Sequence, residues 1–266
     1  MELILLFFLI GSVAGFLAGL LGIGGGLVIV PLLSLVYENY QLHDGIIMQV
    51  AIATSLSTIL FTSLSSIIKH QQHRAILWEI VFKLTPGLLL GAVVGTILLK
   101  NLQSNDLKIL FGCFEILIGL QFLVNFQQFN HKKTMSNTEN PNSIILYVSG
   151  VFIGKISSLF GIGGGTMTVP LLTWLQINIR QAIATSAACG FPIALFATTS
   201  IVVTHVFFNE VEFVPLLIDW RACVFISISS VFFAFLGASK THQIDKRKLE
   251  ILFSMILIIT GIKMCL

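Results

Sequence analysis

Charge is scarce in this chain: only 10% of its 266 residues are Asp, Glu, Lys or Arg, whereas 56% are hydrophobic. A soluble domain of this length cannot bury so much apolar side chain, so the composition predicts an integral membrane protein in a lipid bilayer. The net charge of +3 is small and scattered, without the basic stripe of a nucleic-acid-binding protein, which argues against nucleic acid as a partner. The longest polar stretch runs only from Asn125 to Ser143, too short for a large soluble domain.

Motifs for cofactors and catalysis are also missing. The four cysteines stand alone in apolar segments, at Cys113, Cys189, Cys223 and Cys265, which argues against a zinc site or a redox pair. The chain has no complete nucleotide-binding loop or dinucleotide fingerprint, no Ser/His or paired-Asp motif suited to proteolysis, and no metal-binding helix. We therefore expect no cofactor, no metal and no enzymatic activity, and direct use of ATP would need another subunit.

A duplicated glycine motif dominates what is present. Residues 15–33 read GFLAGLLGIGGGLVIVPLL and residues 154–172 read GKISSLFGIGGGTMTVPLL, with 11 of 19 positions identical at an offset of 139 residues. Each copy lies in the middle of a long apolar stretch. Because the motif returns at residues 143–177, we expect the first copy to belong to the mature protein and not to a signal peptide.

The duplication extends over the whole chain. Ala51–Ser55 recurs as Ala182–Ser186, and Trp78 recurs as Trp220. We expect two homologous halves, residues 1–125 and 143–266, joined by a polar linker loop over 126–142. Each half is predicted to contain one interrupted glycine-rich segment and three transmembrane helices, giving an all-α integral membrane protein. The predicted segments are 3–36, 46–68, 80–99 and 107–125, then 143–177, 182–204, 213–238 and 249–265.

The interrupted segments hold about 34 residues each, too many for one crossing and too few for two. If each segment folds back at its glycines, ten basic residues lie on one side of the membrane and four on the other. Such an imbalance is expected, because cytoplasmic loops carry an excess of lysine and arginine. The ten are Lys69, Arg74, Lys83, Lys132, Lys133, Arg180, Lys240, Lys246, Arg247 and Lys248, and the four are Lys100, Lys108, Arg221 and Lys263. This arrangement predicts that the halves are inverted repeats, as in many secondary transporters.

The glycine clusters are the first candidate binding residues. A helix interior disfavours glycine by about 1 kcal/mol relative to alanine, and a broken helix at membrane depth is tolerated only where protein or a watery cavity covers the backbone. Freed N–H groups at such a break can bind an anion, whereas close helix packing is the alternative role. We predict substrate binding by Gly22, Gly24, Gly25, Gly26, Gly161, Gly163, Gly164 and Gly165, with hinges at Pro31, Pro170 and Pro192.

Hydroxyl groups form the second candidate set. Thr54 and Ser55 on one span match Thr185 and Ser186 on its partner. Hydroxyls can donate hydrogen bonds to anion oxygens without a fixed charge, although serine and threonine in membranes also bond to the backbone or to other helices. We predict that these four residues take part in substrate binding.

Two ionisable residues lie at membrane depth, Lys155 and Glu115. Such residues are costly in a bilayer and often functional. Lys155 would attract an anion, and Glu115 would carry a proton or pair with Lys155. The alternative is that Lys155 extends to the interface and that Glu115 faces a polar neighbour.

At these residues the chain resembles the TauE/SafE family of membrane permeases, also described as sulfite exporters. The matching features are the two GIGGG segments with their prolines, the Ala-Thr-Ser span after each, and the duplicated layout. The resemblance implies a permease of the bacterial cytoplasmic (inner) membrane that moves sulfite, sulfoacetate or another small sulfur-containing or organic anion. The family motif falls on the glycines and prolines named above and on the two Thr-Ser pairs, whereas Lys155 departs from it.

We therefore predict a secondary transporter for a small anion, in which the two glycine breaks meet near the bilayer midplane. The alternatives are a channel-like pore for the same anion and a non-transporting structural subunit of a membrane complex. The sequence leaves the substrate, the direction of transport, the coupling ion and assembly into a homo-oligomer open.

Overall fold

The computed structural model describes residues 2–21, 24–129, 142–208, 217–240 and 246–266, and every element in these ranges is an α-helix. The first half contains α1 (Glu2–Leu21), α2 (Gly26–Asn39), α3 (Ile47–Gln72), α4 (Trp78–Asn101) and α5 (Ser104–Phe129). The second half contains α6 (Ser143–Leu159), α7 (Gly165–Trp174), α8 (Ile179–Phe208), α9 (Trp220–Lys240) and α10 (Lys246–Cys265). Within the described part of the chain, five helices are long and apolar enough to cross a membrane: α1, α3, α4, α8 and α9.

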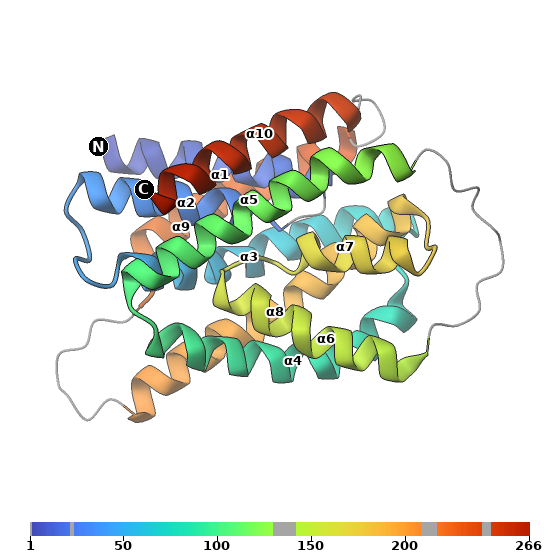
Figure 1. The fold of residues 1–266 in the computed structure, drawn as a ribbon, viewed down its shortest axis with the longest axis horizontal. Helices are drawn as coiled ribbons and strands as arrows, with labels where there is room; N and C mark the ends of the chain where they lie inside the picture. The colour runs from blue at the N-terminus through green and yellow to red at the C-terminus, as the bar shows by residue number, and fades with distance from the viewer. Residues whose placement is uncertain (1, 22–23, 130–141, 209–216, 241–245) are drawn as a thin grey trace.

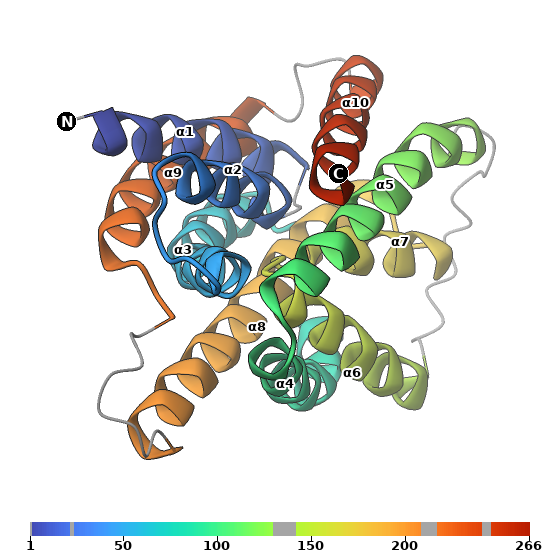
Figure 2. The ribbon, with the colours of Figure 1, turned by 60° about the vertical axis from the view of Figure 1, so that its left-hand side comes forward.

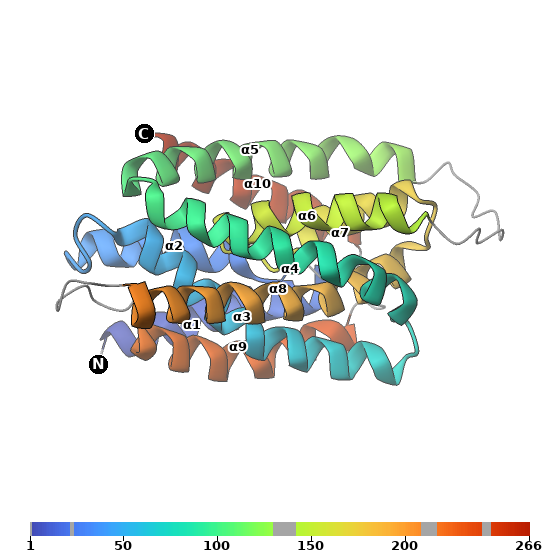
Figure 3. The same ribbon diagram turned by 90° about the horizontal axis from the view of Figure 1, so that it is seen from below.

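Both interrupted segments are helical hairpins (Figures 1 and 3). α1 and α6 each run to the middle of the molecule, and α2 and α7 return toward the end from which their hairpin started. The returning helices hold 14 and 10 residues, fewer than the roughly 20 needed to span a bilayer. Each interrupted segment therefore folds back on itself in the structure, as the distribution of basic residues predicts.

Glycine makes the reversal of each hairpin sterically accessible. The residues that precede the returning helices, Gly25 and Gly164, have φ angles of 76° and 75°. This left-handed conformation costs residues with a Cβ about 1–2 kcal/mol but is open to glycine. The carbonyl of each then accepts hydrogen bonds from the first turn of its helix, with Ile29 N and Thr168 N at 3.0 and 2.9 Å.

The molecule has two ends, which are named here by the elements that lie there (Figures 1 and 3). At the terminal end α1 begins, α2 ends and α10 ends; at the linker end α5 ends, α6 begins and α7 ends. The long helices run between these ends. α3 starts at the terminal end, whereas α8, its counterpart in the second half, starts at the linker end.

The helices pack in reciprocal pairs (Figure 2). α1 packs chiefly against α9, and α4 packs against α6, so the hairpin of each half contacts the second of the three helices that follow the hairpin in the other half. Small residues permit these contacts: a Cβ on Gly15 of α1 would overlap the backbone of Ser230, and one on Gly91 of α4 would overlap that of Val151. α3 pairs with α8 and α5 with α10. The two halves are thus interlocked and do not form separate bodies.

Candidate functional site

The two glycine breaks meet at the centre of the protein. A Cβ added to Gly24 would lie 2.8 Å from Gly163 Cα, and a Cβ added to Gly163 would lie 3.0 Å from Gly24 Cα. Only two glycines permit so close an approach, and we call this contact the glycine crossing. The structure therefore brings together the two breaks that the sequence marks as substrate-binding.

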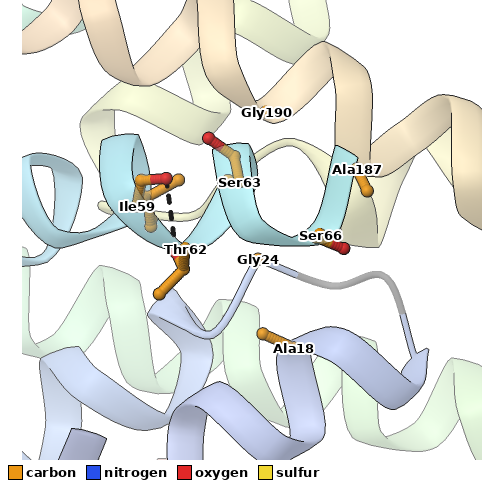
Figure 4. Close-up of a pocket in the computed structure, with 9 residues that line it drawn as sticks. Ala18, Gly24, Ile59, Thr62, Ser63, Ser66, Ala187 and Gly190 are labelled. Atoms are coloured by element: carbon orange, nitrogen blue, oxygen red, sulfur yellow. Dashed lines mark hydrogen bonds between the residues drawn. The ribbon is translucent and has the colours of Figure 1, made fainter. Parts of the chain in front are cut away.

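A pocket lies beside the glycine crossing (Figure 4). It is narrow and partly open to the outside, with room for about one water molecule. Its lining residues come from both hairpins and from α3 and α8: Ala18, Gly24, Ile59, Thr62, Ser63, Ser66, Gly163, Ala187 and Gly190. The residues from α3 run from its midpoint, Ile59, into its last half, and those from α8 belong to its first half, which places the pocket between the crossing and the linker end.

The polar groups of the pocket are hydroxyls of α3. Ser63 Oγ donates to Leu60 O at 3.1 Å, and Thr62 Oγ1 donates to Ile59 O at 3.2 Å. Ser66 differs, because its Oγ is buried and has no hydrogen-bond partner among the described residues. No lining residue carries a charge.

The pocket also lies at the N-terminal ends of two half-helices. Gly24 and Gly163 each precede by two residues the first residue of α2 or α7. The first N–H groups of a helix have no partner inside it, and the helix dipole makes that end positive. The site therefore combines the uncommitted hydroxyl of Ser66 with two positive helix ends, which is a chemical environment suited to an anion.

The remaining predicted glycines pack around the crossing. Gly26 and Gly161 lie against each other, since a Cβ on Gly26 would overlap the carbonyl oxygen of Gly161. Gly25 and Gly164 make the two reversals, and Gly165 is the first residue of α7. Gly22 lies outside the described residues. Substrate contact by these glycines stays a prediction.

The predicted threonine and serine pairs are buried and hydrogen-bonded away from the pocket. Thr54 Oγ1 accepts from Asp219 N at 3.0 Å, and Thr185 Oγ1 accepts from Leu77 N at 3.1 Å. Each threonine therefore holds the residue just before a helix of the opposite half, α9 for Thr54 and α4 for Thr185. Their duplication has a structural role in addition to any role in binding.

The serines that follow them also donate to backbone carbonyls. Ser55 Oγ donates to Gly161 O at 2.9 Å and so ties α3 to the opposite glycine break. Ser186 Oγ donates to Ile183 O at 2.8 Å. Neither serine lines the pocket.

The two ionisable residues are separate in the structure. Lys155 is exposed on α6 and does not line the pocket, while Glu115 is fully buried on α5, where it faces Gly261 of α10. Among the described residues, no ion pair joins them. The predicted pairing of Glu115 with Lys155 is therefore absent, because α6 presents the lysine to the outer surface while α5 turns the glutamate inward.

The three predicted hinge prolines all lie inside helices. Pro31 and Pro170 occupy equivalent places in α2 and α7, and a hydroxyl three residues later donates to each proline carbonyl: Ser34 Oγ at 3.0 Å and Thr173 Oγ1 at 2.9 Å. Pro192 lies in α8, two residues after Gly190 of the pocket. Because proline has no N–H, it removes one hydrogen bond from each helix.

A polar cluster at the terminal end was not foreseen. Tyr37 Oη donates to Asp219 Oδ2 at 3.1 Å, and His43 Nε2 lies 3.8 Å from the same oxygen. Asp219 Oδ1 accepts from Arg221 N and Ala222 N, as an N-cap of α9 does. This cluster, which we call the terminal tie, joins the end of α2 to the start of α9. The corresponding position at the linker end is Leu77, which cannot form such a tie.

Comparison with known proteins places this site in a family. The profile described as "Sulfite exporter TauE/SafE" matches residues 7–264. A "Probable membrane transporter protein" of Haemophilus influenzae is 34% identical over 265 residues, covering 99% of this chain and 98% of the relative.

More distant relatives carry similar descriptions. A probable membrane transporter protein of Methanocaldococcus jannaschii is 27% identical over 98% of this chain and 95% of its own length. The probable membrane transporter protein YunE of Bacillus subtilis is 29% identical over 95% of this chain and 93% of its own length. No solved structure matches the chain.

Proposed function

This chain belongs to the TauE/SafE sulfite exporter family of membrane transporters, and we propose that it is a secondary transporter for a small anion. The observation that carries the proposal is the glycine crossing, where the N-terminal ends of α2 and α7 meet beside a hydroxyl-lined pocket without charged side chains. Broken helices that point their N-termini at a central site are a recurrent way for transporters to hold anionic groups.

An uncharged site suits transport because the anion must also leave. Hydroxyls and helix N-termini supply partial positive charge, whereas a buried lysine or arginine would hold the anion as an ion pair. In this structure the pocket has room for about one water molecule, so a small anion such as sulfite or a short organosulfur or organic anion would enter only when the halves move and the pocket widens. The proposed reaction is translocation without chemical change of the solute, so the protein is not an enzyme.

We infer that the two halves are inverted repeats and that their relative movement gives alternating access. The opposite directions of α3 and α8 support this inference, as do the matching bonds of Thr54 and Thr185 to the opposite half. The pocket lies toward the linker end, and at the other end the terminal tie joins α2 to α9. We assign the linker end to the cytoplasm of a bacterial inner membrane, because ten of the fourteen basic residues counted in the sequence belong to that side.

Flux into proteoliposomes tests the proposal. Purified protein is reconstituted, and uptake of labelled sulfite is measured alone and with a panel of competing anions. Gly163→Ala is the matched variant, since its added Cβ would crowd Gly24 and Ile59 at the crossing, while Gly45→Ala serves as control because no atom lies within 4 Å of its Cβ. Saturable uptake that Gly163→Ala abolishes and Gly45→Ala retains supports the proposal. Absence of flux for every anion, from folded wild-type protein, contradicts it.

A further inference from the structure

The pocket has a counterpart in the sequence on the other side of the glycine crossing. Offsets of 139 residues in the hairpins and 131 residues in α3 and α8 relate the two halves. Under these offsets Gly24 exchanges with Gly163 and Ile59 exchanges with Gly190, so the pocket maps partly onto itself. The other lining residues, Ala18, Thr62, Ser63, Ser66 and Ala187, map onto Ser157, Ile193, Ala194, Ala197 and Leu56.

The mapped residues are slightly less exposed than the pocket residues. Ser66 is 4% exposed and its counterpart Ala197 is 0% exposed, while Ala187 is 7% exposed and its counterpart Leu56 is 0% exposed. Ala18 at 5% corresponds to Ser157 at 1%. All of these residues are buried, and the mapped set is packed more tightly than the pocket set.

Ile193 fills the second site. Its Cδ1 lies 2.5 Å from the position that a Cβ on Gly164 would occupy. Two hydroxyl oxygens surround the same position, Thr168 Oγ1 at 3.8 Å and Ser157 Oγ at 3.9 Å. The Ile193 methyl group and the two hydroxyls, which come from the two limbs of the second hairpin, thus all lie beside Gly164.

Both hydroxyls lack a partner among the described residues, a state that they share with the hydroxyls of Ser66, Thr166 and Thr198. Neighbouring hydroxyls bond to their own helix: Ser158 Oγ donates to Gly154 O at 2.8 Å and Thr173 Oγ1 to Val169 O at 2.9 Å. Ser157 and Thr168, at 1% and 0% exposure, have no hydrogen-bond partner within the described ranges. A buried hydroxyl without a partner is unfavourable, so its retention calls for a state of the protein in which it is used.

The chemistry of the second site suits the same solute as the pocket. Gly164 precedes α7, whose N-terminal end supplies N–H donors and partial positive charge, and the hydroxyls add O–H donors. A metal cation would find oxygen lone pairs here, but it would be repelled by the positive helix end. The first half has Ala18 and Ile29 at the corresponding positions, so these donors belong to the second hairpin alone.

We propose that Ser157, Thr168 and Gly164 form a second half-site for the transported oxyanion, closed by Ile193 in this structure and opened toward the terminal end in the opposite transport state. The proposal rests on the proposed function, because it assigns a second station to the same solute. Rupture of the terminal tie and withdrawal of Ile193 would expose the half-site as the linker-side pocket closes. Ile193 takes the place of Thr62, so the two stations differ in polarity as well as in position.

Sided cysteine labelling tests the second half-site without any transported solute. The background protein has serine in place of the exposed Cys113 and Cys265 but keeps the buried Cys189 and Cys223, and its labelling is the baseline. Ser157→Cys and Ser66→Cys are each added to this background. A membrane-impermeant methanethiosulfonate reagent is applied to either face of oriented vesicles. Ser66→Cys is expected to react from the linker face. Ser157→Cys is expected to react slowly from the terminal face, and roughly tenfold faster when Ile193→Ala is added.

Each outcome decides the proposal. The proposal is overturned if Ser157→Cys reacts from the linker face, or if it does not react even when Ile193→Ala is added. If Ser157→Cys does not fold, Thr168→Cys is labelled in its place. Flux of labelled sulfite and competing anions is measured on the same proteins. Normal wild-type flux with the wrong labelling pattern refutes the second half-site and keeps the transporter. The expected labelling without flux of any anion keeps the two-sided opening and refutes the assigned solute.

Discussion

Removal of the Ser66 hydroxyl should separate folding from substrate binding. Ser66 is 4% exposed, lines the pocket, and its Oγ has no hydrogen-bond partner in the described part of the structure. A buried hydroxyl left unpaired costs the folded state about 1–3 kcal/mol. Ser66→Ala removes that cost, so the free energy of unfolding should stay the same or rise by about 1 kcal/mol.

The same substitution should weaken binding of the anion. A hydrogen bond to a charged group contributes about 1.5–3 kcal/mol, and each 1.4 kcal/mol corresponds to about tenfold in affinity. If Ser66 Oγ donates to the anion, Ser66→Ala should raise the KM for uptake by roughly tenfold to hundredfold. Ser66→Ala would therefore weaken transport while the free energy of unfolding rises or stays the same.

The neighbouring Ser65 is the matched control for this prediction. Its Oγ donates to Val231 O of α9 at 3.0 Å, and the residue does not line the pocket. Ser65→Ala removes this bond between α3 and α9 and should lower stability by about 1 kcal/mol with little change in KM. Thermal unfolding in detergent and uptake into proteoliposomes are measured on both variants. A Ser66→Ala protein that unfolds earlier and keeps the wild-type KM would refute the reasoning.

Three further substitutions test other parts of the account. Gly24→Ala should lower the melting temperature in detergent more than Gly45→Ala does. Both glycines have positive φ, which costs alanine about 1–2 kcal/mol, but of the two only Gly24 lies against another backbone segment. Equal shifts in melting temperature would contradict the glycine crossing. Tyr37→Phe breaks the terminal tie and should lower the free energy of unfolding, measured by chemical denaturation, by about 1–3 kcal/mol. Tyr40→Phe, at an exposed position, should leave that free energy unchanged. Equal effects of the two substitutions would argue against the tie. Lys155→Gln should leave the initial uptake rate within about twofold of wild type, because the side chain is exposed and does not line the pocket. Loss of uptake in this variant would instead indicate that Lys155 takes part in substrate binding.

The sequence was most informative where local chemistry determines the backbone. A Gly-Gly-Gly run with a proline five residues later cannot continue as a regular helix in apolar surroundings, and both copies reverse direction at the expected residues. Duplication then indicated that the two breaks have equivalent roles. Their contact at Gly24 and Gly163 follows from that equivalence together with the packing of the hairpins.

The sequence was less informative where a side chain acts on a distant segment. Thr54 looked like a ligand for the anion, but its hydroxyl accepts from Asp219 N, 165 residues away. Tyr37 and Asp219 are 182 residues apart, and no local pattern links them. The hydroxyls of the pocket did leave a signal, because Thr62 and Ser66 follow Thr58 at intervals of four along one face of α3. That signal is weak because α8 has Ile193 and Ala197 at the matching positions, so duplication does not reveal it.

Counterflow in proteoliposomes tests the central claim of alternating access most directly. Vesicles are loaded with unlabelled anion at high concentration, and entry of a trace of the same labelled anion is followed from outside. A carrier that exposes its site to one side at a time should show transient accumulation of label above the equilibrium level, because each outward trip of unlabelled anion returns an empty or labelled site. The account predicts this overshoot in the wild type and its loss in Gly163→Ala. Label that rises only to equilibrium, with no overshoot at any internal concentration, would indicate a pore and contradict the account.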